Sequence, residues 1–171
     1  TAFSQTEKFD IATFVPPQGW QRIDTNSTVA FMDSKTTDGL TSFCQIILYP
    51  SSKSTNTADN NFKNAWQNLV TVSTKSKAKP DVQTEQTPDG WTVVTGSANI
   101  SFSGINYKTI LACISGFGKT MPVQVNTAGG DYLGTLNKFF KDLNLDSKAT
   151  VTGPHQPNNA NNNNQTVINN S

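Results

Sequence analysis

The sequence is poor in charged residues, histidine and cysteine. Charged residues make up 15% of the 171 positions, against roughly 25% in an average globular protein, and the net charge is only +1. We therefore expect no nucleic-acid partner, because such binding relies on concentrated positive charge. One histidine and two cysteines are too few for a zinc cluster, and no apolar stretch approaches the ~18 residues of a membrane span. We expect no metal site, no cofactor and no transmembrane segment.

Hydroxyl and amide side chains take the place of the missing charges. Thr, Ser and Asn together account for 57 of the 171 residues. A surface rich in these groups suits an exported protein better than a cytosolic helical enzyme. The first residues, Thr1 to Gln5, resemble what remains of a secretory signal's cleavage region. We expect an exported bacterial protein, secreted or periplasmic, with residues 1–6 as the arm left after removal of a signal peptide.

Apolar runs and turn residues predict an antiparallel sheet. Strands are expected at residues 9–14, 28–32, 41–49, 82–86, 91–102, 106–115 and 121–125. The near-continuous apolar run from Cys44 to Leu48 predicts cover on both faces of its strand. The residues at 88–90 and 103–105 are typical of tight turns, which favours a meander of neighbouring strands.

Two segments have the apolar period of amphipathic helices. The first covers 58–72, and the second covers 131–143 with Gly129-Gly130-Asp131 as its cap. Both helices need a common apolar surface, so we expect one α+β domain over 7–149, with about six to seven strands and two main helices. Residues 150–171 are rich in Pro and Asn and are predicted to be a low-complexity tail that cannot order itself.

Catalytic patterns are weak throughout the sequence. The segment Cys113 to Thr120 ends like a phosphate-binding loop, but Cys113 stands where the pattern needs its first glycine. The residues after Thr120 also predict a strand where such a loop needs a helix. The single histidine, His155, lies in the tail, which leaves a Ser or Cys nucleophile without a base. We assign no catalytic residue. Carboxylates distant in the sequence could still meet, so a hydrolase with dispersed acid and base residues stays open.

The cysteines and aromatic residues have mainly structural interpretations. Cys44 and Cys113 each lie within an apolar strand, which favours two buried free thiols over a disulfide. Trp20 and Trp91 each follow a Pro-x-Gly turn, where tryptophan usually closes the end of a core. Because a tryptophan can also stack on a ligand, Trp20 and Trp91, together with Tyr49, are the ligand-binding candidates.

The expected elements follow a recognisable order over roughly residues 7 to 145. Phe9-Asp10-Ile11 leads to Pro17-Gln18-Gly19-Trp20, and the strand 42–49, the first helix, the hairpin 91–115 and the second helix follow. This order resembles the PsbP-like fold. The resemblance implies an α/β/α sandwich around an antiparallel sheet, and proteins of that fold act mainly as accessory or binding modules. Cystatin-like and lipocalin-like scaffolds also combine antiparallel meanders with helices, so the function must be argued from the site itself.

These observations favour a non-enzymatic accessory or binding domain with a protein or small-molecule partner, expected to be monomeric. The alternatives are the hydrolase and a structural spacer whose Asn-rich tail links it to another module. A polar cleft with converging carboxylates would favour the hydrolase, and an exposed apolar patch would favour the binding domain.

The tail is expected to contribute almost nothing to folding, because it has few apolar residues to bury. The 1–149 fragment should therefore keep the stability of the whole chain to within about 0.5 kcal/mol. Urea unfolding of the two proteins measures this difference. A clearly lower midpoint for the fragment would show that the tail docks on the domain.

Overall fold

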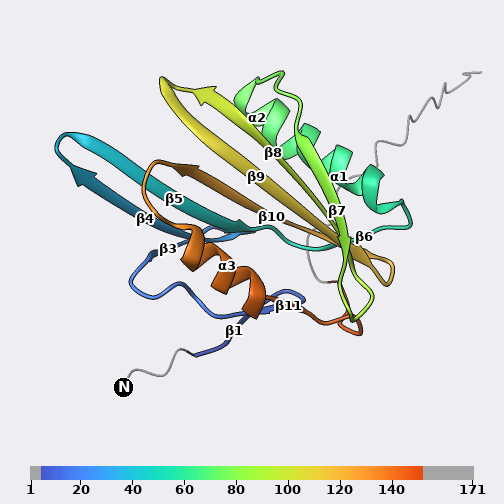
Figure 1. Ribbon diagram of the computed structural model, residues 1–171. Helices are drawn as coiled ribbons and strands as arrows, with labels where there is room; N and C mark the ends of the chain where they lie inside the picture. Colours follow the sequence, from blue (N-terminus) through green and yellow to red (C-terminus); the bar gives the residue numbers. More distant parts are fainter. Residues whose placement is uncertain (1–4, 152–171) are drawn as a thin grey trace, which may run out of the picture.

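The computed structural model describes residues 5–151, and its centre is one large antiparallel sheet (Figure 1). The main sheet has eight strands in the order β3-β4-β5-β10-β9-β8-β7, with β6 paired to β10. Its strands are β3 (Gln21–Asp24), β4 (Val29–Thr37), β5 (Leu40–Leu48), β6 (Ser52–Lys53), β7 (Asp81–Gln86), β8 (Thr92–Phe102), β9 (Ile105–Gly116) and β10 (Lys119–Ala128). A small second sheet consists of β1 (Glu7–Phe9), β2 (Ala12–Phe14) and β11 (Asn144–Leu145).

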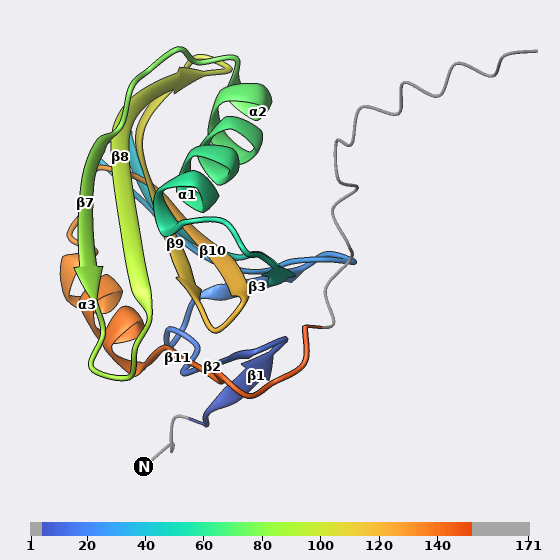
Figure 2. The same cartoon turned by 90° about the vertical axis from the view of Figure 1, so that its right-hand side faces the viewer.

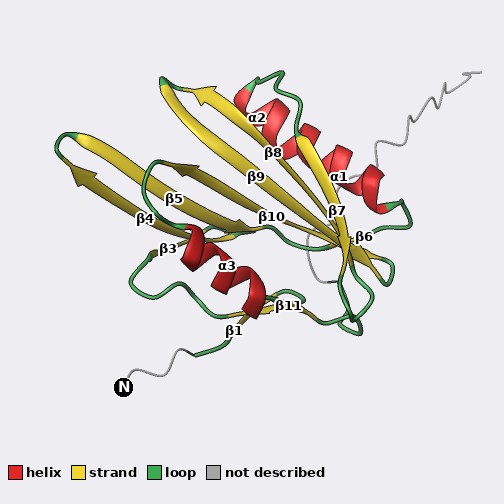
Figure 3. Cartoon of the chain, viewed as in Figure 1, coloured by secondary structure: helices red, strands yellow, loops and turns green. Residues whose placement is uncertain are grey.

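The helices lie on opposite faces of the main sheet (Figures 2 and 3). One helical segment runs without a break through α1 (Ala58–Trp66), the π-helical turn η1 (Gln67–Thr71) and α2 (Val72–Thr74). The second helix, α3 (Leu133–Asp142), lies with the small sheet on the other face. The predicted α+β class, with an antiparallel sheet flanked by two helices, is confirmed.

Each face of the sheet has its own core, because a strand presents alternate side chains to opposite faces. On the α1 side, Phe62, Trp66 and Val70 pack against Val94 and Leu111. The larger core on the α3 side joins the main sheet, α3 and the small sheet. Its largest fully buried members are Phe14, Phe31, Ile11, Ile46, Leu48, Met121, Val123 and Val125.

Helix α1 begins where the sequence supplies a capping residue. The side chain of Thr57 accepts a hydrogen bond from the backbone N–H of Asn60, which satisfies one of the free donors of the first turn. Asn61 is buried between the helix and the sheet, where its Nδ2 donates to Oγ of Ser115 at 3.0 Å and its Oδ1 accepts from Ser54. The helix is thereby fixed over β8 and β9.

Two local expectations are wrong. The single strand expected at 9–14 is the hairpin β1–β2, because Asp10 adopts a left-handed conformation with φ of 53° that reverses the chain. Its Oδ2 accepts hydrogen bonds from the backbone N–H and the hydroxyl of Ser51, both at 2.6 Å. Helix α3 is not capped by Asp131, because its N-cap is Tyr132, which provides no side-chain cap.

Several strands differ in length from the sequence prediction. The short strand β3 pairs with β4 and was not expected, and β4 and β10 are both longer than expected. Residues 1–4 of the predicted arm and the tail from 152 onwards lie outside the described residues.

Gly96 provides a test of packing between α1 and the sheet. A Cβ at this position would lie 2.3 Å from Cζ of Phe62 and 3.0 Å from Cβ of Pro80. We expect Gly96→Ala to lower the free energy of unfolding by about 1–3 kcal/mol, because the ring of Phe62 must move within a packed core.

The matched control is Gly134→Ala, in α3, where a Cβ meets no atom within 4 Å. This change should be neutral or should stabilise by up to about 1 kcal/mol, because alanine favours helix. Urea unfolding compares the two variants, and equal stability of Gly96→Ala and the original protein would contradict the described packing.

Candidate functional site

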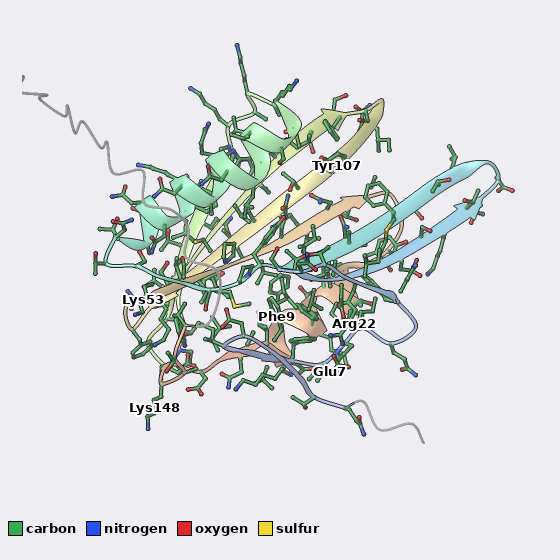
Figure 4. The ribbon with its side chains drawn as sticks, turned by 180° about the vertical axis from the view of Figure 1, so that it is seen from behind. Glu7, Phe9, Arg22, Lys53, Tyr107 and Lys148 are labelled. Atoms are coloured by element: carbon green, nitrogen blue, oxygen red, sulfur yellow. The ribbon has the colours of Figure 1, made fainter. Side chains whose placement is uncertain are left out.

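Strands β4, β5 and β10 have a core face toward α3 and a partly exposed face toward the side of α1. The helices on that side pack on β8 and β9, with only slight contact to β10. We call the partly exposed surface the open face. It consists of Ala30 and Met32 on β4, Phe43, Gln45, Ile47 and Tyr49 on or just after β5, and Gln124 and Asn126 on β10. Ala30 and Gln124 are buried, and the other six residues are partly buried. Figure 4 views the molecule from this side.

The residues that make up the open face are all uncharged. Strands β3, β4, β5 and β10 contain five charged residues, and the alternation of side chains places all five on the α3 side: Arg22, Asp24, Asp33, Lys35 and Lys119. The guanidinium of Arg22 lies 5.6 Å from the ring centre of the core residue Phe31 and pairs with Glu7 and Asp24. In Figure 4, Glu7 and Arg22 lie near each other and away from Tyr107.

A hydrogen-bond network of neutral side chains runs across the open face. The hydroxyl of Tyr49 donates to Oε1 of Gln124 at 2.7 Å. Nε2 of Gln124 donates to Oγ1 of Thr109 at 2.9 Å and to Oδ1 of Asn126 at 3.2 Å. Nδ2 of Asn126 then donates to Oε1 of Gln45 at 3.3 Å. The network therefore fixes the amide groups of Gln124 and Asn126 in one orientation.

Exposure changes along this network from buried to partly open. Gln124 is 5% exposed and Thr109 is 1% exposed, so both depend on their hydrogen-bond partners for stability. Gln45, Tyr49 and Asn126 are only partly buried. Burial raises the pKa of the Tyr49 phenol to about 12, because the charged phenolate is poorly solvated there. The phenol consequently keeps its proton and its role as a donor well above neutral pH.

Aromatic side chains lie at one end of the open face. The rings of Phe43 and Tyr107 lie 6.2 Å apart and are inclined at 59°. Phe43, Met32 and Ile47 belong to neither core, although all three are partly buried. Cover was predicted for both faces of the strand at 41–49. Among the described residues, the α3 side of this strand is buried, whereas the side that carries Ile47 is only partly buried.

An open pocket of about 440 Å³ lies where β8, β9 and the end of β10 meet. Tyr107 also lines this pocket, together with polar residues that include Asn99, Asn106 and Thr127. Of the described residues in its lining, Lys108 alone is charged. The pocket therefore adjoins the aromatic end of the open face, because Tyr107 contacts Phe43 and Ala128 pairs with Phe43.

The structure separates the three ligand-binding candidates that were inferred from the sequence. Tyr49 lies on the open face, within the hydrogen-bond network. Trp91 is 2% exposed in the α3-side core, where its ring contacts Phe117 edge to face at 5.0 Å. Trp20 packs at the margin of the same core, where its ring centre lies 5.7 Å from the ring centre of Tyr132. The structure therefore brings neither tryptophan together with Tyr49.

The other residues of the network were not identified from the sequence. Gln124 and Asn126 alternate with Val123 and Val125 in β10. This alternation is typical of any strand with one solvated face, so it does not mark the two amides as part of a site. The signal that could have identified them is long-range, because their position beside Gln45 depends on β10 pairing with β5.

Both cysteines are buried free thiols on opposite faces of the sheet. Burial raises the pKa of the Cys44 thiol to about 11 and also raises the pKa of Cys113, so neither provides a thiolate near neutral pH. Within the segment Cys113 to Thr120, Phe117 and Gly118 form the turn between β9 and β10, and both have positive φ. A strand follows this turn, as the sequence predicted.

Two observations concern metal ions and membranes. Within residues 5–151, no group of three or more His, Cys, Asp or Glu side chains is arranged to hold a metal ion. Among the same residues, no helix combines the length and the hydropathy that crossing a membrane requires.

The raised pKa of Tyr49 predicts an alkaline loss of stability. The unfolded chain releases the phenol proton near its ordinary pKa of 10, whereas the folded protein keeps it to about 12, so this residue's contribution falls as pH rises through that window. Tyr49→Phe should cost about 1 kcal/mol near neutral pH, through the lost hydrogen bond to Gln124. The difference from the original protein should narrow above pH 10. Urea unfolding at several pH values measures it, and a constant difference would contradict the burial of this phenol.

Comparisons with known proteins identify no family. No family of known proteins matches the chain, and no curated protein does. A crystal structure of a protein from Bacteroides thetaiotaomicron VPI-5482 is similar at a TM-score of 0.49 with 9% sequence identity. The match covers 80% of this chain and 45% of that one, so the chain spans less than half the length of its structural neighbour.

Proposed function

We propose that this protein is an exported, non-enzymatic binding domain that holds its ligand on the open face. The observation that carries the proposal is a hydrogen-bonded, uncharged surface in which the partly exposed Tyr49, Asn126 and Gln45 surround the buried amide of Gln124. Amides in the middle of a sheet usually either face bulk water or lie beneath a helix. Here they are ordered by one another beside partly exposed apolar side chains, which is the combination found in ligand sites.

The distribution of carboxylates favours binding over hydrolysis. An acid and base pair must lie within hydrogen-bond reach of the reacting group, and the strand residues of the open face include no Asp or Glu. Asp24 and Asp33 lie on the opposite face of their strands. Tyr49 keeps its proton because its pKa is raised, which makes it a poor general base near neutral pH.

Two features of the sequence support the remaining parts of the proposal. The high content of Thr, Ser and Asn supports export to the periplasm or the medium. The resemblance of the element order to PsbP-like proteins supports an accessory role as a monomeric partner of another molecule.

Fragment screening by NMR tests the proposal, because it locates a binding site without requiring the natural ligand. We expect a mixed library of charged and uncharged fragments to shift the side-chain amide signals of Gln45 and Asn126 and the backbone signal of Ile47. Preformed ligand sites attract such fragments more than flat surfaces do. Gln83 and Gln86 of the exposed strand β7 serve as internal controls and should not move.

The result that would contradict the proposal is equally specific. Hits concentrated in the pocket around Lys108 would place the binding site there instead of on the open face. Hits scattered over the surface with no preference would show that the open face is not a preformed binding site.

A further inference from the structure

We propose that the ligand of the open face is a neutral, hydroxyl-rich molecule, namely a sugar or a short uncharged oligosaccharide. This inference rests on the proposed function, because it names the ligand class of the same site. It depends on the charge of the surface, the direction of its hydrogen bonds, its aromatic end and the pairing of its backbone.

The charge distribution selects an uncharged ligand. All five charged residues of β3, β4, β5 and β10 lie on the face away from the site. An ionic ligand would lose hydration on binding and gain no opposite charge from these strands, which makes its binding costly. A neutral polar ligand loses much less hydration and can recover its hydrogen bonds from the amides.

The direction of the network suits hydroxyl groups. Each donor points toward the next residue, from Tyr49 through Gln124 and Asn126 to Gln45. At the far end, no described residue accepts a hydrogen bond from Nε2 of Gln45, so its two N–H groups can donate to a ligand. At the near end, the phenolic oxygen of Tyr49 retains acceptor capacity. A hydroxyl both donates and accepts, so a molecule with several hydroxyls can use both ends.

The aromatic end supplies the apolar half of the site. Phe43 lies two positions from Gln45 on the same face of β5 and contacts Tyr107 across the sheet. A pyranose ring has hydroxyls at its rim and C–H groups on its faces. The C–H face can therefore rest on an aromatic ring while the hydroxyls reach the amide of Gln45.

The backbone of the site favours a small ligand over an extended peptide. Recognition of a peptide by strand addition needs an unpaired sheet edge. On the open face, β5 is paired with β4 and β10, and β10 is paired with β5 and β9. The main-chain groups of both strands are thus already used, and only side chains remain for recognition.

The test uses an array of neutral, acidic and basic oligosaccharides, with titration of each hit in free solution. We expect binding to be confined to neutral members. Gln45→Glu keeps the size of the side chain and removes its two donors, so it should weaken binding roughly tenfold or more. Phe43→Ala should weaken binding to a similar extent. Gln83→Ala, on the exposed strand β7, is the matched control and should bind like the original protein.

The outcomes separate this inference from the proposed function. Binding of only acidic or basic members, or no binding by any neutral member, overturns the ligand class. If the NMR fragments still cluster at Gln45 and Asn126, the proposed binding function stands although the sugar ligand is wrong. Equal losses in Gln45→Glu and Gln83→Ala place the sugar site away from the open face and also overturn the inference. A melting curve of each variant confirms folding, and Gln45→Glu decides alone if Phe43→Ala does not fold.

Discussion

Strand β10 lies at the centre of the main sheet between β5 and β9, and its two faces have different surroundings. Its residues Met121, Val123 and Val125 are at most 1% exposed in the core beneath α3. The residues between them face the other side, where the helix covers mainly β8 and β9. Gln124 and Asn126 therefore lie in the middle of a sheet with little helical cover, and their amides need partners from neighbouring strands.

Those partners follow from the register of the strands. Asn126 lies directly opposite Gln45 of β5 and Thr109 of β9, so it joins the two halves of the sheet. Directly opposite side chains on a sheet are close enough to interact, and a slip of one residue would move the whole set to the other face. The same register that buries the apolar residues of β10 thus creates the polar network. The arrangement of the network therefore follows from the pairing of β10 with β5 and β9.

Local patterns were sufficient to predict the helices and the meander, because each depends on residues near one another in the chain. The helix at 58–74 follows from the spacing of Phe62 and Trp66, and the turn at 103–104 follows from its Ser-Gly pair. The hairpin at 7–14 was missed because its turn depends on Asp10 in a left-handed conformation, which its sequence does not mark. The central position of β10 in the sheet could not be predicted from the sequence either. Proline has no backbone N–H to donate, so Pro122 disfavours a central strand. The carbonyl of Pro122 accepts a hydrogen bond from the N–H of Tyr49, which shows that its backbone polar groups face β5 and β6. The absent N–H therefore lies where β10 changes its pairing partner from β5 to β6.

The central claim is that the amide network of the open face exists before any ligand binds. Solvent exchange of side-chain NH₂ groups in the free protein tests this most directly, because a hydrogen-bonded, buried amide exchanges slowly. The account predicts slow exchange for Gln124, intermediate exchange for Asn126 and fast exchange for Gln45, whose donors no described residue accepts. Uniformly fast exchange, equal to that of Gln83 on the exposed strand β7, would contradict the network and the binding surface built on it.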